Sequence, residues 1–399
     1  MKCKITNKAI TPFMSFGKMP IANGFLKKKD FNKEYSFNME VGFSEDISLF
    51  QLNEHPKPEQ MFNDKYPFFS GSSEYMKNQF SNYADYIKKN YLKGQSKIIE
   101  IGSNDGTLLK NFKDSGNEIL GFEPSKNVAL KAKSLQIPTL NEFFNIKTVK
   151  NLNNFLGTTD VICASNVICH VPNLDDLIKA VDLLLSKNGV FVFEEPYLGS
   201  MFKKISYDQI YDEHVFIFLI NSINKIFKLY DFVLVDAIPQ ITHGGSMRYV
   251  IKRKNMGKKT QNLNNFLENE KKDKIDTIEA CYEFKKKCEE SKNKVCEKLN
   301  KMKENGKSIC GYAATSKSTT ILNYCNIDSK IINFICDTTE EKIGKFSPGM
   351  HIPIVDMKHF YNNLPDIVYL FAWNHKDEIL KKESVFTEIK REWISHVKI

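Results

Sequence analysis

The ten residues Lys97–Gly106, which read Lys-Ile-Ile-Glu-Ile-Gly-Ser-Asn-Asp-Gly, decide how the chain is predicted to fold. Their first half is a short apolar run of the kind that forms a buried strand. Gly102 ends this run, and because it has no Cβ the backbone there can approach a ligand closely. Gly106 then stands where a helix would open. A strand, a glycine turn and a helix in this order predict the first unit of a parallel α/β sheet.

Strand and helix patterns continue to alternate beyond this unit. The runs that predict further strands cover residues 118–123, 160–166, 189–193, 232–236 and 247–252, the last two expected to be antiparallel. The patterns that predict helices cover residues 76–94, 127–135 and 173–186. We therefore predict a doubly wound, Rossmann-like sheet, in which ligands bind beyond the carboxyl ends of the strands.

The chain of 399 residues is too long for one ordinary core. Residues 1–75 contain several prolines and no long helical period, which predicts a small β-rich or loop-rich module. Residues 76–255 hold the sheet. Residues 256–305 are charged and free of proline, which predicts a helical connector. Residues 306–399 start a second strand–helix alternation, and they predict a smaller Rossmann-like α/β domain at the C-terminus.

Composition and charge exclude several classes of partner. The formal charge is +9, but much of the lysine lies in residues 252–307 among many acidic residues, as on a solvated helix face. Nucleic-acid binding would need a patch of one sign with interleaved aromatics, so we expect none. No apolar run approaches the ~20 residues that span a bilayer. No secretory signal follows Met1, so we expect a cytoplasmic location and no membrane association.

The nine cysteines are odd in number and irregularly spaced in a chain without an export signal. Reduced thiols are therefore expected. No C-x-x-C motif occurs, so a structural zinc site lacks its usual local signature.

The loop after the first strand predicts a cofactor site. Glu123 follows Gly102 by 21 residues and ends the second strand, where a carboxylate can accept from two ribose hydroxyls. The loop is not G-x-G-x-x-G, and no basic residues suited to a pyrophosphate follow it. An adenosyl cofactor without phosphates, S-adenosylmethionine (SAM), therefore fits better, although an ordinary βα turn with a surface glutamate is the alternative. The predicted cofactor residues are Gly102, Asn104, Asp105, Glu123, Asn141, Phe143 and Asn166.

A second cluster of residues predicts proton transfer. Residues Tyr207–His214 place two tyrosines, two aspartates, a glutamate and a histidine within eight positions. We expect this stretch to converge with His170, Glu194–Glu195 and His243 above the sheet. Histidine suits a base because its pKa lies near neutrality, and hydroxyls or a second histidine suit a developing oxyanion. For any single residue, a buried structural role is the alternative, and the segment from His243 could equally be a tight turn.

These residues resemble the SAM-dependent sugar C-methyltransferases, which act at C-3 of nucleotide-linked 4-keto-deoxysugars. The similar motifs are Tyr66-Pro-Phe-Phe-Ser-Gly-Ser-Ser73, Glu100-Ile-Gly-Ser-Asn-Asp-Gly106, Gly121-Phe-Glu-Pro-Ser125, Ala164-Ser-Asn-Val-Ile-Cys-His-Val-Pro172, Tyr207–His214, His243-Gly-Gly-Ser246 and Phe371-Ala-Trp-Asn-His375. The resemblance covers nearly the whole chain. It implies a fold with a SAM-dependent methyltransferase domain, and a nucleotide-diphosphate sugar as the partner.

The resemblance also implies roles for individual residues. His214 would be the base, and Tyr66, His170, Tyr211 and Glu213 would complete the catalytic site. The C-terminal domain would help to hold the diphosphate, with the turn Gly311–Lys317 as a candidate contact. The expected substrate residues are Glu195, Tyr197, His243, Lys317, Asn374 and His375.

One departure from the family concerns metal. The N-terminal module of the family usually holds zinc with two C-x-x-C pairs, whereas the matching segments here are Cys3-Lys-Ile-Thr6 and Ser44-Glu-Asp-Ile47. Zinc is therefore not expected, and we expect Phe13, Phe16, Phe43 and Leu49 to hold the module together instead.

Two other functions stay open on the sequence alone. A sugar O-methyltransferase would need only one base near a hydroxyl, and a non-catalytic nucleotide-sugar-binding relative would need none. The retention of the tyrosines and histidines together argues against lost chemistry. A monomer or weak dimer is expected.

Overall fold

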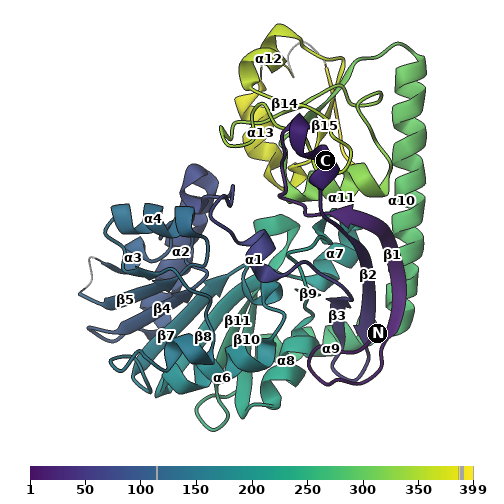
Figure 1. Ribbon diagram of the computed structural model, residues 1–399. Coiled ribbons are helices and arrows are strands. Elements are labelled where there is room, and N and C mark those ends of the chain that lie inside the picture. Colours follow the sequence, from purple (N-terminus) through teal and green to yellow (C-terminus); the bar gives the residue numbers. More distant parts are fainter. Residues whose placement is uncertain (114–115, 385, 387–390, 399) are drawn as a thin grey trace.

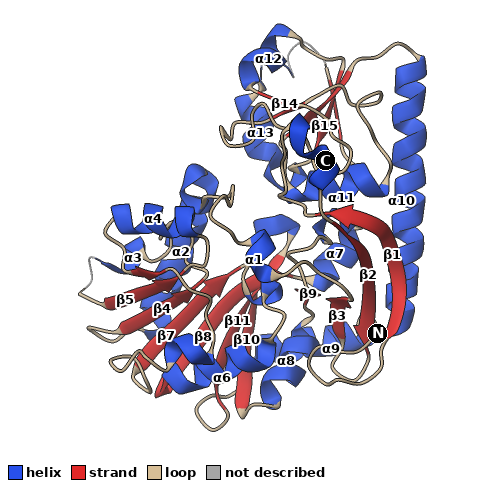
Figure 2. Ribbon diagram, viewed as in Figure 1, coloured by secondary structure: helices blue, strands red, loops and turns tan. Residues whose placement is uncertain are grey.

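The computed structural model describes residues 1–113, 116–384, 386 and 391–398, and these form three sheets in three regions of the molecule (Figure 1). Helices flank the largest sheet, and a long helix joins the other two regions (Figure 2). Among the described residues, no helix combines the length and the apolar character that crossing a membrane requires.

The largest sheet has seven strands among the described residues, in the order β10-β11-β8-β7-β4-β5-β6. The strands are β4 (Lys97–Ile101), β5 (Glu118–Phe122), β6 (Thr139–Leu140), β7 (Thr159–Ser165), β8 (Leu185–Pro196), β10 (Phe232–Gln240) and β11 (Ser246–Arg253). Strands β4 to β8 are parallel, and β10 and β11 are antiparallel. The predicted doubly wound sheet and its antiparallel pair are confirmed. The chain winds outward in both directions from the neighbours β4 and β7, which is where such sheets bind ligands.

Both faces of this sheet are buried. Its helices are α2 (Glu74–Tyr91), α3 (Lys110–Lys113), α4 (Lys126–Ser134), α5 (Ile146–Val149), α6 (Leu174–Leu184) and α8 (Ile220–Lys228). Helix α7 (Leu198–Lys204) follows β8 and packs instead with residues of the N-terminal sheet and the C-terminal domain. Ile98 packs in the cluster that includes residues of α2, and Ile99 packs in the opposite cluster with residues of α6. Successive residues of β4 therefore enter two cores, which explains why isoleucines occur on both faces of this strand.

The N-terminal sheet is antiparallel and consists of β1 (Thr11–Pro20), β2 (Ser36–Ser44), β3 (Leu49–Leu52) and β9 (Phe216–Ile217). Phe13, Phe16, Phe43 and Leu49 are buried, as expected for this module. Strand β9 begins two residues after His214. The sheet thus extends beyond residues 1–75 and ties the N-terminal module to the Tyr207–His214 segment.

The short helices of the first three hundred residues are η1 (Lys28–Lys33), α1 (Pro58–Met61), η2 (Ser70–Ser72), η3 (Ile168–His170), η4 (Tyr207–Gln209) and η5 (Thr242–Gly244). The helical connector consists of α9 (Gln261–Lys272) and α10 (Ile278–Glu304). Helix α10 runs from the N-terminal sheet, where it contacts β1, to the C-terminal domain (Figure 1).

The C-terminal domain has a parallel sheet in the order β14-β13-β12-β15-β16. Its strands are β12 (Ile309–Tyr312), β13 (Ile335–Cys336), β14 (Ile354–Val355), β15 (Ile367–Leu370) and β16 (Glu392–Ile394), and its helices are α11 (Ser316–Tyr324), α12 (Met357–Asn362), η6 (Trp373–His375) and α13 (Lys376–Lys382). The second α/β unit is present as predicted.

Candidate functional site

A cavity of about 700 Å³ opens beyond the carboxyl ends of the central strands of the seven-stranded sheet. Three parts of the chain line it. The N-terminal part contributes Asn23 and the segment around Tyr66, the middle part contributes the loops after β4, β5 and β7, and the C-terminal domain contributes the start of α11. The site predicted from separate motifs is therefore one continuous space.

Five of the predicted cofactor residues line this cavity: Gly102, Asn104, Glu123, Phe143 and Asn166. Gly102 has a φ of 65°, and a Cβ there would lie 2.4 Å from a side-chain carbon of Val167, so only glycine fits. The Glu123 carboxylate accepts hydrogen bonds from the backbone N–H groups of Asn104 at 3.0 Å and Ser125 at 2.7 Å. A carboxylate offers about four acceptor positions, so two remain for ribose hydroxyls.

The other two predicted cofactor residues support the loop and do not line the cavity. Asp105 accepts a hydrogen bond from the backbone N–H of Gly71 at 2.8 Å. Asn141 donates to the backbone carbonyls of Glu123 at 2.9 Å and Pro124 at 2.8 Å. Asp105 therefore anchors η2 above the cofactor loop, and Asn141 holds the turn that presents the Glu123 carboxylate.

All five predicted catalytic residues line the cavity: Tyr66, His170, Tyr211, Glu213 and His214. The Nδ1 of His214 lies 2.6 Å from the carbonyl oxygen of Gln209, and a carbonyl can only accept, so Nδ1 carries the hydrogen. The Nε2 of His214 lies 2.8 Å from the hydroxyl of Tyr211 and therefore accepts from it. Burial, and next His170, lower the pKa of His214 well below its usual range, so the ring is neutral.

His170 faces the same space without a partner. Its Nε2 is buried and has no hydrogen-bond partner among the described residues, and its ring stacks on His214 at 5.3 Å between centroids. Burial lowers the pKa of His170 to about 3, so the imidazole is neutral. A buried polar atom without a partner is costly unless a ligand completes it. His170 is thus available to a substrate.

Glu213 is held by two neutral donors. The hydroxyl of Tyr66 donates to its Oε2 at 3.2 Å, and the side-chain amide of Asn23 donates to its Oε1 at 2.7 Å. Burial raises the pKa of Glu213 to about 7, which the two hydrogen bonds counteract only in part. This carboxyl group therefore changes charge near neutral pH.

The first half of the Tyr207–His214 segment serves the fold. Tyr207 is fully buried, and its hydroxyl lies 3.6 Å from the sulfur of Cys325. Asp208 accepts a hydrogen bond from the indole N–H of Trp373 at 2.7 Å. These contacts fasten the segment to the C-terminal domain, so the cavity receives only the side chains near its end.

One group of side chains in the described part of the chain could be considered for a metal ion. The sulfur of Cys169 and ring nitrogens of His170 and His214 lie within 4.8 Å of one another. The two rings are nearly parallel, with 22° between their planes, so their in-plane lone pairs run side by side and do not converge. Both nitrogens of His214 are also hydrogen-bonded within the protein. These residues therefore do not fit a metal ion.

The C-terminal domain closes the far end of the cavity. Lys317, in the first turn of α11, is 9% exposed and has no hydrogen bond or ion pair among the described residues. The predicted substrate residues His243, Lys317, Asn374 and His375 all line the cavity. His243 also has a φ of 52°, so the segment is both a tight turn and part of the lining.

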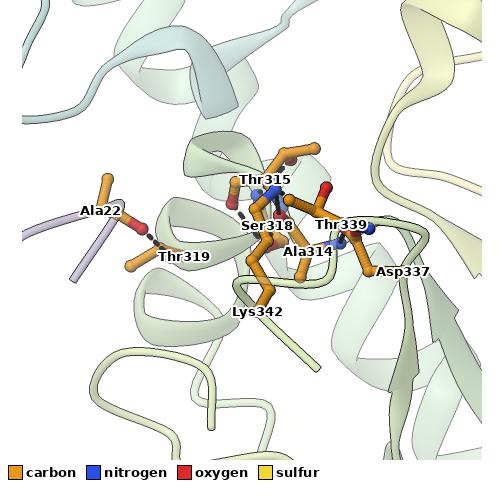
Figure 3. A network of polar contacts seen from close by, with 8 residues as sticks. All are labelled: Ala22, Ala314, Thr315, Ser318, Thr319, Asp337, Thr339 and Lys342. Carbon is orange, nitrogen blue, oxygen red and sulfur yellow. Dashed lines mark hydrogen bonds and ion pairs between the residues drawn. The ribbon is translucent and has the colours of Figure 1, made fainter. Parts of the chain in front are cut away.

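Figure 3 shows the polar network around the start of α11. Asp337 accepts from the backbone N–H groups of Ala314 at 2.7 Å and Thr339 at 2.8 Å, and Lys342 donates to the carbonyl of Ala314 at 2.8 Å (Figure 3). Lys342 lines the cavity as well. Sequence analysis did not identify Lys342, although its place shortly after the strand β13 (Ile335–Cys336) was a usable signal.

Glu195 and Tyr197, which we also expected to contact substrate, lie outside the lining. Glu195 accepts from the backbone N–H groups of Val167 at 3.0 Å and Ile168 at 2.7 Å, so it supports the turn that leads to His170. The hydroxyl of Tyr197 donates to Glu270 at 2.9 Å. Both side chains satisfy polar groups beneath the cavity.

Known sequence families match the chain in three consecutive parts. Residues 3–62 match a family described as "Putative zinc binding domain", residues 75–237 a "Methyltransferase domain", and residues 241–397 a "C-methyltransferase C-terminal domain".

One curated relative matches most of the chain, and a second matches about a third of it. The C-methyltransferase NovU of Streptomyces niveus is 26% identical over 378 residues, which is 94% of this chain and 90% of NovU. An uncharacterized methyltransferase of Staphylococcus carnosus is 26% identical over 145 residues, which is 35% of this chain and 64% of that protein.

Solved structures resemble part of the chain. The complex of the Haloferax volcanii Trm112 methyltransferase activator with a methyltransferase matches with a TM-score of 0.38 and 12% identity, covering 46% of this chain and 94% of the other. The magnesium protoporphyrin IX methyltransferase of Synechocystis with bound SAM matches with a TM-score of 0.34 and 14% identity, covering 44% and 79%.

The match of residues 3–62 counts against the expectation that zinc is absent, because the module belongs to a type associated with zinc. The donor atoms nevertheless do not fit a tetrahedral site. Cys3 is fully buried in the apolar cluster that contains Ile47 and Leu49, and its sulfur accepts the backbone N–H of Thr6 at 3.4 Å. Structural zinc needs four ligands, and this position offers one thiol.

Proposed function

The chain belongs to the SAM-dependent sugar C-methyltransferase family, and from this premise we propose that it methylates C-3 of a nucleotide-linked 4-keto-deoxysugar. The observation that carries the proposal is the Tyr211–His214 pair beside the unpartnered His170. The three side chains form a neutral proton-transfer group that shares one cavity with the cofactor loop. Methyl transfer to a hydroxyl oxygen would need a base but no second group to stabilise an enolate.

The chemistry requires a base and a stabilised oxyanion. A C-3 proton becomes acidic only because the neighbouring ketone can take up the negative charge. In the proposed reaction the oxygen of Tyr211 takes the C-3 proton while its own hydroxyl proton passes to Nε2 of His214. The resulting imidazolium remains hydrogen-bonded on both nitrogens, to Gln209 and to Tyr211. His214 is thus the final base, and it acts through Tyr211.

His170 is suited to the developing enolate. In the tautomer that carries its hydrogen on Nε2, it donates to the ketone oxygen, which would satisfy the buried nitrogen that has no partner in the described part of the chain. A preorganised donor aimed at developing charge is usually the largest contribution to such a step. SAM, when bound, supplies the methyl group that the nucleophilic C-3 takes.

Residues of the middle part and of the C-terminal domain support the assignment of cofactor and substrate. Glu123 and Asn104 would hold the adenosyl group at the carboxyl ends of β4 and β5. At the other end, Lys317 is a buried side chain with no hydrogen bond or ion pair among the described residues, and it lies in the first turn of α11, where helix N–H groups favour anions. Together with Lys342 it would contact the nucleotide diphosphate.

The test is to incubate the protein with SAM and a panel of dTDP- and GDP-linked 4-keto sugars and to locate the new methyl group by mass spectrometry and NMR. We expect a product with a carbon-bound methyl group from wild-type protein and none from His214→Ala. A methyl group on oxygen would favour a sugar O-methyltransferase. Binding of the sugar nucleotide without turnover would favour a non-catalytic relative. The cytoplasmic location and the monomeric or weakly dimeric state remain predictions.

A further inference from the structure

The loop that follows β1 reaches the catalytic cluster from the N-terminal module. The backbone N–H of Ala22 donates to Asp212 at 2.8 Å, and the side chain of Asn23 donates to Glu213 at 2.7 Å. The carbonyl of Ala22 accepts from the hydroxyl of Thr319 on α11 at 2.8 Å (Figure 3). One short loop therefore touches the catalytic segment and the substrate end of the cavity together.

We propose that Asn23 is a positioning residue of the methyl-transfer site, which holds the Glu213 carboxyl group in its orientation toward the cavity. The inference rests on the proposed function, because the reaction for which Glu213 is positioned is the proposed methyl transfer. It gives the N-terminal module a direct part in that reaction. Asn23 itself lines the cavity.

The bond matters because Glu213 has few partners. The groups that face it are Asp212 and Tyr211 on its own segment, Tyr66 from the segment before α2, Cys169 from the turn after β7, and Asn23. None of these is a cation. Asn23 makes the shorter of the two hydrogen bonds to the carboxyl group, 2.7 Å against 3.2 Å for Tyr66.

Loss of the amide would therefore act on both the charge and the orientation of Glu213. A hydrogen bond donated to a carboxylate favours its charged form, so the pKa of Glu213 should rise above its present value of about 7 when Asn23 is shortened. Oε1 would also lose the partner that fixes it, and the carboxyl group would be free to turn.

The loop itself does not depend on the Asn23 side chain. Ala22 is held by its two backbone bonds, and the backbone N–H of Gly24 donates to the carbonyl of Ile21 at 2.9 Å. The module is also paired to the chain beyond His214 through β3 and β9. Asn23→Ala should therefore leave the backbone in place and remove one donor.

The experiment compares Asn23→Ala and Asn23→Asp with Asn38→Ala, a matched change at an exposed position of β2 in the same module. For Asn23→Ala we expect kcat/KM for the keto sugar to fall about 10- to 100-fold, as for loss of a hydrogen bond to a charged group. The acid limb of the pH–rate profile should move to higher pH, and SAM affinity should stay unchanged. For Asn23→Asp we expect a larger fall in kcat/KM, because the new carboxylate would repel the carboxylate of Glu213.

Two further measurements separate positioning from general structural support. In a Glu213→Gln background, Asn23→Ala should have little additional effect, because the residue acts through Glu213. In protein labelled with ¹³C at glutamate carboxyl groups and studied without any sugar, the Glu213 resonance, identified by its loss in Glu213→Gln, should titrate at higher pH in Asn23→Ala.

The NMR titration keeps this inference distinct from the proposed function. If wild-type protein turns over no 4-keto sugar, the proposed function is wrong, and so is a role of Asn23 in methyl transfer. The titration of Glu213 would still show whether Asn23 binds its carboxyl group. Asn23→Ala that titrates and reacts like Asn38→Ala would overturn the inference even if wild-type protein is fully active.

Discussion

Replacing Tyr211 by phenylalanine removes one oxygen atom from the centre of the site and tests the proposed path of the proton. The hydroxyl lies 2.8 Å from Nε2 of His214, whose other nitrogen is occupied by the carbonyl of Gln209. Without this oxygen the base keeps its tautomer but loses the atom that takes the C-3 proton. Tyr211→Phe should therefore behave like a variant without the base.

The expected loss of rate follows from the role of Tyr211 and His214 as a general acid–base pair. Removing a general acid–base group typically costs 10²- to 10⁴-fold in rate, or about 3–5 kcal/mol in the barrier. Because Tyr211 and His214 act as one unit, the double variant Tyr211→Phe/His214→Ala should be hardly worse than either single one. The free energy of unfolding should fall by only about 1 kcal/mol for Tyr211→Phe, the usual worth of one hydrogen bond.

The assay isolates proton removal from methyl transfer. Protein in deuterated water, with a 4-keto sugar nucleotide and S-adenosylhomocysteine, which cannot donate a methyl group, should exchange the C-3 proton, as followed by NMR. Tyr211→Phe and His214→Ala should both lose exchange and methylation, with SAM affinity near normal. Tyr207→Phe is the matched control, because that hydroxyl is buried against Cys325 in the same segment and away from the cavity.

Two outcomes would refute the reasoning. If His214→Ala loses exchange while Tyr211→Phe keeps it, His214 removes the proton directly and the relay is wrong. If His214→Ala keeps wild-type methylation, His214 is not the base, and Glu213, with its pKa of about 7, becomes the group to examine.

The remaining predictions concern the cofactor, the metal and the effect of pH on stability. Glu123→Ala should weaken SAM binding by about 1–3 kcal/mol in calorimetry, the cost of removing a buried charged acceptor, and unchanged affinity would contradict the ribose assignment. Purified protein should contain no stoichiometric zinc, and elemental analysis giving one zinc per chain would refute this. Burial raises the pKa of Glu195 from 4.5 to about 7, so its contribution to stability is fully present below pH 4.5 and is lost as the pH rises through 7. Chemical unfolding should give a free energy of unfolding that is up to about 3 kcal/mol lower at pH 8 than at pH 5 in wild-type protein. The difference should be smaller in Glu195→Gln, whose amide oxygen can still accept from the backbone N–H groups of Val167 and Ile168.

Several site residues could be recognised from the sequence because their role depends on local order along a strand and its loop. Gly102 follows β4 and Glu123 follows β5, two mostly apolar strands, and parallel strands bring their carboxyl ends to one edge. The density of ionisable groups in Tyr207–His214 likewise marked the catalytic segment before any contact was known.

Other assignments needed the direction of a side chain, which composition does not reveal. Glu194 and Glu195 are neighbours on β8 and point to opposite faces. Glu194 pairs with Arg248 at 2.6 Å, whereas Glu195 accepts from the turn before His170, and neither lines the cavity. The position of a residue at the end of a strand therefore predicted that it lies near the cavity, but not whether its side chain points into the cavity.

The sequence by itself thus determined the order of strands and helices and singled out the predicted cofactor loop and the predicted catalytic segment, because these depend on periodicity and on residues close together in the chain. Only the tertiary structure decided which groups meet across long separations. Asn23 bonds to Glu213 across 190 positions, and β9 joins a sheet whose other strands lie before residue 53. Such contacts form when separate cores pack together, and no local pattern in the chain encodes them.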